Sequence, residues 1–183
     1  MTQPAFIVID IQNDYFPEGA MPLEEVGGAA KKGQTALEYA RQKELAVIVV
    51  QHISLSPNAT FFRPNTAGAE IYPGFHPRQS ELHLVKHYPN AFRETNLHER
   101  LQSLGIKALV VCGMMTHMCI DSTVRAAADL GFSVTLLGDA TATRDLRYND
   151  RSVPALAVQT AVLASLHGTF ARVVATRDWI DGA

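Results

Sequence analysis

Short apolar runs alternate with longer amphipathic stretches along the chain. The runs are rich in valine, isoleucine and leucine, which is typical of strands buried on both faces of a parallel sheet. They predict strands at residues 5–9, 45–50, 82–86, 108–112, 132–137 and 172–175. Between them, apolar residues at helical spacing predict helices at residues 27–43, 96–105, 119–131 and 153–167. Strands that alternate with helices predict an α/β fold with a parallel sheet between two layers of helices.

One long segment lacks any regular pattern. Residues 51–79 are rich in proline, asparagine, glycine and aromatic residues. Long structured loops in compact domains are usually functional, so we expect a lid that covers a pocket and sets specificity. We also expect its aromatic side chains to be exposed and to suit an oligomer interface. A shorter turn is predicted at residues 138–143.

Composition narrows the class of protein. The 183 residues are 47% hydrophobic and 19% charged, which indicates one globular domain over residues 1–183. The net charge is -2 and no basic stripe carries interleaved aromatics, so nucleic acid is not an expected partner. No apolar run reaches the roughly 18 residues of a membrane span, and the first residues lack the basic leader of a signal peptide. Two cysteines make no disulfide framework, so we expect a cytoplasmic protein with reduced thiols.

Three reactive side chains stand at the carboxyl ends of predicted strands. Asp10 follows the first strand, Lys86 ends the third, and Cys119 begins the helix after the fourth. In parallel sheets these ends share one edge, and ligands bind there where the strand order reverses. A helix N-terminus and a lysine both favour a thiolate. The set predicts nucleophilic catalysis by Cys119, with Asp10 as general base and acid and Lys86 stabilising the thiolate. Cys112, in the middle of a strand, is expected to be buried and inert.

Several motifs follow one another in a specific order: Ile9-Asp-Ile-Gln-Asn-Asp-Tyr-Phe16, Lys86 with Ala91, Phe92 and Thr95, Gly113-Met-Met-Thr-His-Met-Cys119, Arg125-Ala-Ala-Ala-Asp-Leu-Gly131, and Asp139-Ala140. Together they resemble the isochorismatase-like cysteine hydrolase family over nearly the whole chain. The resemblance implies a Rossmann-like three-layer α/β/α fold with a six-stranded parallel sheet in the order 3-2-1-4-5-6. It also implies a triad of Asp10, Lys86 and Cys119. Relatives often assemble as dimers or larger rings, so a homo-oligomer is expected.

The resemblance further implies a cis peptide bond between Met114 and Met115. This bond would direct the backbone amides of Met115 and Cys119 toward the substrate oxygen, as an oxyanion hole.

Departures from the family pattern narrow the predicted reaction. Nicotinamidases of the family hold a metal with an Asp-x-His pattern after the second strand, where this chain has His52 and Ser54. The carboxylate and the paired histidine are missing, so no metal and no cofactor are expected. Isochorismatases cleave a vinyl ether, which needs a general acid but no nucleophile, and some such relatives have glycine at the cysteine position. The presence of Cys119 favours attack on the acyl carbon of a small amide-type substrate.

Other side chains near these motifs are candidate substrate contacts: Gln12, Phe16, His52, Phe61 and His117. Gln12 could instead orient the carboxylate or the turn, and His52 could be purely structural. Positions two apart on a helix do not face each other, so a dyad of His117 with Cys119 is not expected.

Arg144 and Arg147 are interpreted as surface residues, or with Tyr148 as contacts to a neighbouring subunit. Two other functions fit the same sequence. One is vinyl-ether hydrolysis of the isochorismatase type, and the other is non-catalytic binding of a small molecule on the same fold.

Overall fold

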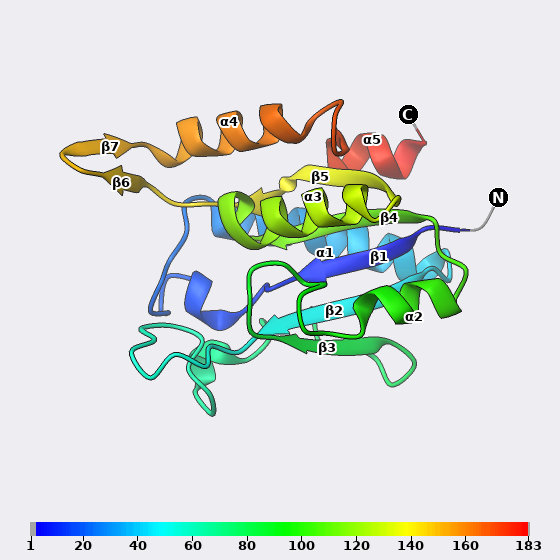
Figure 1. Cartoon of the computed structure of the whole chain (residues 1–183), viewed down its shortest axis with the longest axis horizontal. Coiled ribbons are helices and arrows are strands. Elements are labelled where there is room, and N and C mark those ends of the chain that lie inside the picture. Colours follow the sequence, from blue (N-terminus) through cyan, green and yellow to red (C-terminus); the bar gives the residue numbers. More distant parts are fainter. Residues whose placement is uncertain (1–2, 183) are drawn as a thin grey trace.

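A six-stranded parallel sheet forms the centre of the molecule, which we describe over residues 3–182 of a computed structural model (Figure 1). Its strands are β1 (Ala5–Ile9), β2 (Ala46–His52), β3 (Leu82–Lys86), β4 (Ala108–Met114), β5 (Ser133–Ala142) and β8 (Arg172–Val174). Their order is β3-β2-β1-β4-β5-β8, and every neighbouring pair is parallel. Since β8 is the sixth strand of this sheet along the chain, the predicted fold and strand order are confirmed.

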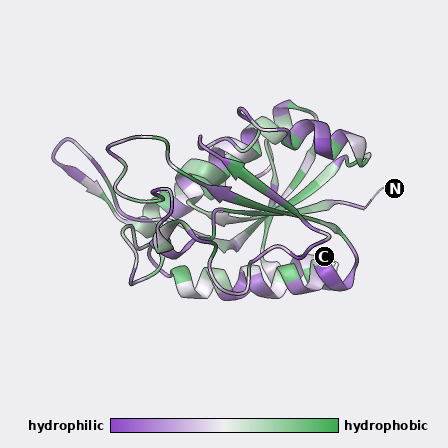
Figure 2. Ribbon diagram, turned by 90° about the horizontal axis from the view of Figure 1, so that it is seen from below, coloured by the Kyte–Doolittle hydropathy of each residue, from purple (hydrophilic) through white to green (hydrophobic). Residues whose placement is uncertain are grey.

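Helices cover both faces of the sheet. α1 (Val26–Gln42) and α5 (Thr176–Asp181) pack on one face, and α2 (Leu97–Ser103), α3 (Asp121–Asp129) and α4 (Ala155–Leu166) on the other. The alternation within β1 shows why: Phe6 and Val8 join the core beside α1, whereas Ile7 joins the core beside α2 and α3. Figure 2 shows the apolar strands between the helical layers. Burial on both faces explains the continuous apolar runs in the sequence.

Gly113 allows β1 and β4 to lie close together at their carboxyl ends. It pairs with Ile9 and has a φ of 132°, and a Cβ atom there would collide with the carbonyl group of Ile9. The prediction that β4 stops before this glycine was wrong, because the strand continues to Met114. The close approach brings the residue after β1 next to the turn after β4.

The predicted turn at residues 138–143 is mostly strand. β5 runs to Ala142, and its register with β4 shifts so that Val111 pairs with Leu136 but Gly113 with Thr141. The extra residues of β5 form an irregularity in its pairing with β4, and the strand continues beyond it. β5 therefore reaches the same edge of the sheet as β4.

The sequence pattern missed one hairpin and one helix. β6 (Leu146–Tyr148) and β7 (Arg151–Val153) form an antiparallel hairpin that extends away from the sheet (Figure 1). The helix is α5. Within residues 3–182, no helix combines the length and apolar character needed to cross a lipid bilayer.

The irregular segment predicted as a lid starts later than expected, because Gln51 and His52 belong to β2. Buried polar side chains tie the rest to β2 and to the turn after β1: Gln51 Nε2 donates to Ala69 O at 2.8 Å, and Asp14 Oδ2 accepts from the Phe62 amide at 2.6 Å. The expectation of exposed aromatics was wrong for Phe62 and Phe75, which are each 1% exposed. Both rings pack into the core beside α1, so they are not free to form an interface.

Candidate active site

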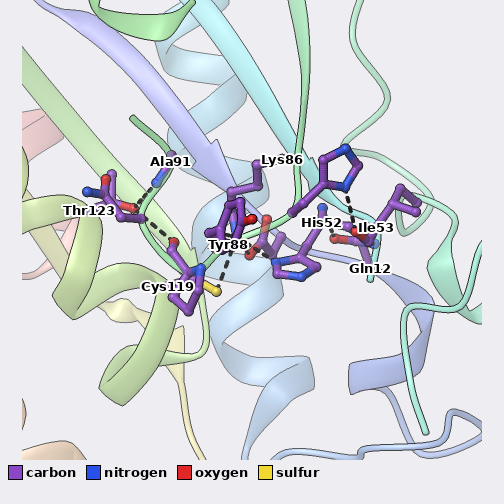
Figure 3. Close-up of polar contacts among 12 residues, drawn as sticks. Gln12, His52, Ile53, Lys86, Tyr88, Ala91, Cys119 and Thr123 are labelled. Atoms are coloured by element: carbon purple, nitrogen blue, oxygen red, sulfur yellow. Dashed lines mark hydrogen bonds and ion pairs between the residues drawn. The ribbon is translucent and has the colours of Figure 1, made fainter. Parts of the chain in front are cut away.

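Asp10, Lys86 and Cys119 meet at the carboxyl edge of the sheet. The Lys86 ammonium lies 2.7 Å from Asp10 Oδ2 and 3.2 Å from Cys119 Sγ. All three residues are buried, with 0%, 0% and 4% of their surfaces exposed. Figure 3 shows Lys86 and the sulfur of Cys119 joined across the site. The structure therefore brings together the three residues that the sequence singled out.

Lys86 has four acceptor atoms around one ammonium group. Besides Asp10 and Cys119, its Nζ contacts His52 Nδ1 at 2.9 Å and Tyr88 O at 3.0 Å. His52 is the direct register partner of Lys86 where β2 and β3 end side by side. An ammonium has only hydrogens to donate, so Nδ1 accepts and the imidazole carries its proton on Nε2. Burial, and then the charge of Lys86, lower the pKa of His52 to about 4, so the ring is neutral at pH 7.

The protonation state of Cys119 differs from the predicted thiolate. Burial alone would lower the pKa of Lys86, but Asp10 and Cys119 more than offset it, so the group is an ammonium. Burial, and then the Asp10 carboxylate, raise the pKa of Cys119, and Lys86 only partly opposes them. The resting cysteine is therefore a thiol, because desolvation and the carboxylate outweigh the ammonium.

Asp10 is placed to take the thiol proton. It follows β1 with a φ of 52°, a left-handed conformation that is uncommon for a residue with a side chain. Its Oδ1 is buried and has no hydrogen-bond partner among residues 3–182. An unpartnered carboxylate oxygen beside a thiol keeps the acceptor capacity that a general base needs.

Cys119 lies in a wide helical turn rather than in a regular α-helix. The turn, η3 (Thr116–Ile120), is a π-helix in which the Ile120 amide donates to Met115 O at 3.2 Å. It precedes α3, so the helix begins earlier than the predicted residue 119. The Met114–Met115 peptide bond is cis, at the position that the resemblance implies. Met115 is the N-cap of this turn and Cys119 lies within it, and backbone N–H groups in the first turn of a helix lack intrahelical acceptors.

The loop after β3 is held against α3. Thr123 Oγ1 accepts from the Ala91 amide at 3.0 Å (Figure 3). It donates to Pro89 O at 3.4 Å. This pair of bonds positions the segment whose Tyr88 carbonyl binds Lys86. Thr123 and Tyr88 were not predicted from the sequence, because neither stands at the end of a strand.

Gln12 is a positioning residue rather than the predicted substrate contact. It is fully buried, and its Nε2 donates to His52 O at 2.9 Å and to Ala69 O at 2.7 Å. Its Oε1 accepts from the His52 amide at 2.8 Å. The amide group is fully occupied by backbone groups, so Gln12 fixes His52 in place.

Aromatic side chains form a wall beside the site. Tyr15, Phe61 and Phe62 are in mutual ring contact, and Phe62 also contacts His52 with ring centroids 5.7 Å apart. Tyr15 lies within the electrostatic reach of Cys119 and Asp10, and burial followed by these two groups raises its pKa. Phe61 is partly buried and remains a candidate substrate contact.

Phe16 and His117 make their contacts outside the cluster of Asp10, Lys86 and Cys119. Phe16 stacks on Tyr72 with centroids 3.4 Å apart and lines a cavity of about 770 Å³ with Asn13, and neither Cys119 nor Lys86 lines that cavity. His117 is partly buried, and its Nδ1 lies 2.6 Å from Thr143 Oγ1. Within residues 3–182 no hydrogen bond joins His117 to Cys119, in keeping with the expectation against a dyad.

The site also contains a set of atoms that could bind a metal. Asp10, His52 and Cys119 each offer a ligand atom within 4.8 Å of the others. Lys86 Nζ contacts all three, at 2.7, 2.9 and 3.2 Å, so an ammonium occupies the position among them. Its positive charge opposes a second cation at that place. The donor set fits an ammonium-centred site better than a metal site.

Comparisons with known proteins agree with this geometry. The isochorismatase domain family matches residues 4–168. The chain is 46% identical to the isochorismatase family protein YddQ of Bacillus subtilis, itself uncharacterised, over 96% of this chain and 98% of that protein. It is 28% identical to nicotinamidase 3 of Arabidopsis thaliana, over 87% and 83% of the two chains.

Among solved structures, a provisionally assigned isochorismatase hydrolase from Oleispira antarctica superposes with a TM-score of 0.94. The two are 39% identical, and the match covers 100% of both chains. The family match spans most of the described chain and includes Asp10, Lys86 and Cys119. The chain therefore belongs to the isochorismatase family of hydrolases.

Proposed function

We propose that this protein is a metal-independent cysteine hydrolase that cleaves an amide-type C–N bond of a small molecule through a thioester on Cys119. The observation that carries the proposal is the Lys86 ammonium, which contacts Asp10 Oδ2 at 2.7 Å and Cys119 Sγ at 3.2 Å. A carboxylate, an ammonium and a thiol within one buried site are the parts that nucleophilic attack on an acyl carbon requires.

The first half-reaction forms the thioester. Asp10 accepts the thiol proton as the Cys119 sulfur bonds to the carbonyl carbon, and Lys86 holds the negative charge near the sulfur during the transfer. The carbonyl oxygen becomes an oxyanion, which the backbone amides of Met115 and Cys119 stabilise. The C–N bond then breaks, and Asp10 gives its proton to the leaving nitrogen.

The second half-reaction returns the thiol. Asp10 takes a proton from water as the water oxygen attacks the thioester carbon. The carbon–sulfur bond breaks, the carboxylic acid leaves, and the proton on Asp10 returns to sulfur. Proton transfer by a positioned side chain typically accelerates such steps by about 10²–10⁴-fold.

Two further observations support an amide substrate. A vinyl ether needs no nucleophile, whereas here the sulfur lies 3.2 Å from a buried ammonium. The related nicotinamidase 3 acts, by its name, on an amide. The substrate itself would be selected by the wall of Tyr15, Phe61 and Phe62 and by the segment that follows β2.

A panel of small primary amides tests the proposal. The wild-type protein should release ammonia from at least one of them, and rapid quenching followed by mass spectrometry should show an acyl group on the peptide that contains Cys119. Cys119→Ala should lose both signals, whereas the control Cys112→Ala should keep them. Amide turnover that survives Cys119→Gly would contradict a thioester, and hydrolysis of a vinyl ether by the same variant would favour vinyl-ether chemistry. Ligand binding by Cys119→Ala, with no turnover of any panel member by the wild type, would instead favour a binding protein.

A further inference from the structure

One cationic side chain near the site has a buried nitrogen without a partner. Among residues 3–182, the buried side-chain polar atoms that lack a hydrogen bond belong to Asp10, Thr116, Arg144 and Gln159. Asp10 and Thr116 are already part of the site or of its first turn. Buried polar groups are almost always hydrogen-bonded, so an unpartnered one indicates a missing partner such as a ligand. The unpartnered Nε of Arg144 is the cationic member of this set.

Arg144 stands close to the candidate nucleophile along the sheet edge. It follows β5, whose Ala142 pairs with Met114 at the end of β4. Its neighbour Thr143 bonds to His117 at 2.6 Å, and His117 lies in the same turn as Cys119. The charge of Arg144 acts on both His117 and Tyr15. The guanidinium therefore lies near the site, and the side chain is partly buried rather than fully exposed.

One edge of the Arg144 guanidinium has no hydrogen-bond partner among the described residues. Nη1 donates to Asp145 O at 3.1 Å, which fixes the group. Nε is buried, and neither Nε nor Nη2 has a protein hydrogen bond among the described residues. These two nitrogens form the side-on edge that binds both oxygens of a carboxylate. The residue as a whole is only partly buried, so other atoms of the side chain are exposed although Nε is shielded.

We infer that the Nε–Nη2 edge of Arg144 binds a carboxylate of the substrate, so that the substrate is a small amide that also carries a carboxylate. The inference rests on the proposed function for the identity of the cleaved bond. The carboxylate would supply the missing partner of Nε, and its charge would complement a guanidinium that Asp145 binds only through a neutral backbone carbonyl.

Arg147 provides a matched control. It has the same side chain, follows Arg144 by three residues and is exposed on β6. Replacing it removes the same charge from the same region without touching the buried guanidinium. Arg144→Lys keeps the charge but loses the side-on edge, so it separates the geometry of recognition from its electrostatics.

The test uses half-amides and their matched diamides: oxamate with oxamide, malonamate with malonamide, succinamate with succinamide, and glutaramate with glutaramide. Binding is measured by titration calorimetry in Cys119→Ala, in which no chemistry occurs, and in its combinations with Arg144→Gln, Arg144→Lys and Arg147→Gln. We expect at least one half-amide to bind at least tenfold more tightly than its diamide. Arg144→Gln should weaken binding of that half-amide by about 10- to 100-fold, and Arg144→Lys should weaken it less than Arg144→Gln does. Arg147→Gln should change the affinity less than twofold.

The outcomes separate this inference from the proposed function. Equal binding of every half-amide and its diamide would overturn the inference, as would a preference that survives Arg144→Gln with the circular dichroism unchanged. Turnover of amides by the wild type would then still support the proposed function. Conversely, a preference that depends on Arg144, in a protein that never forms an acyl-enzyme, would leave the carboxylate site standing and contradict the hydrolase mechanism.

Discussion

Cys112 and Cys119 show what burial does to a thiol with and without charged neighbours. Both are free and almost fully buried, and burial raises the pKa of each. Cys112 lies within β4, opposite Val8, among apolar side chains, and burial is the only cause of its shift. Cys119 has a carboxylate and an ammonium that act on it in opposite directions. The two thiols therefore differ not in burial but in whether other elements bring a carboxylate and an ammonium to the sulfur.

The largest expected contrast is in catalysis. Cys119→Ala should lower kcat by about 10⁴-fold or more on any amide that the wild type hydrolyses, because the nucleophile is lost. Cys112→Ala should change kcat less than twofold and cost about 1–2 kcal/mol of stability through a small cavity. Steady-state ammonia release and urea unfolding measure the two effects. Comparable loss of activity in both variants would remove the functional distinction between the cysteines.

The second contrast concerns the buried ion pair. Lys86→Met leaves the Asp10 carboxylate buried without its cation, so the free energy of unfolding should fall by about 3–5 kcal/mol. Urea denaturation measures this change, with Lys107→Met at an exposed position as the control, expected within about 0.5 kcal/mol of wild type. The double variant Asp10→Asn with Lys86→Met should regain part of the loss. A loss below about 1 kcal/mol for Lys86→Met would show that the pair is not buried as described.

The free energy of unfolding should depend on pH because of His52. The pKa of His52 is about 4 in the folded protein, below its ordinary value of 6.5, so the unfolded chain binds the proton first as the pH falls. The contribution is fully present above about pH 6.5 and is lost as the pH falls toward 4. After discount for partial exposure, it is about 2 kcal/mol. His52→Asn keeps an acceptor for Lys86 but does not titrate. Unfolding curves at pH 7 and 4.5 should show a smaller decrease for this variant, and equal decreases would contradict the assignment.

The smallest contrast is in the reactivity of the thiol itself. Asp10 raises the pKa of Cys119, so Asp10→Asn should lower it and increase the rate of alkylation by iodoacetamide at pH 7, even though hydrolysis is lost. Lys86 lowers the same pKa, so Lys86→Met should slow alkylation. Changes of about tenfold correspond to one pKa unit. Peptide mass spectrometry in a Cys112→Ala background records only Cys119. Shifts of the same sign in both variants would argue against opposing roles.

The sequence was sufficient to predict the sheet and the three residues at its edge. Apolar runs such as residues 5–9 mark strands because both faces are buried, and the carboxyl ends of parallel strands necessarily share an edge. Asp10 and Lys86 were found by their positions at the ends of such runs. His52 could have been linked to Lys86 in the same way, since their strands end in register.

Other features depend on contacts that no local pattern records. The continuation of β5 past Gly138 depends on pairing with β4, and the hairpin of β6 and β7 is too short and too exposed to show an apolar alternation. The thiol state of Cys119 depends on a balance between desolvation and two charges from distant parts of the chain. The role of Arg144 becomes visible only when the bonds of its guanidinium are assigned atom by atom.

The four acceptors around the three hydrogens of Lys86 have a consequence for the proposed reaction. While the sulfur is free, the three N–H donors of the ammonium cannot each bond to all four acceptors, so one acceptor has no hydrogen of its own. Acylation would change this, because a thioester sulfur is a poor acceptor and the remaining three neighbours match the three hydrogens one for one. The lysine would then be best satisfied in the covalent intermediate, without any movement of its own.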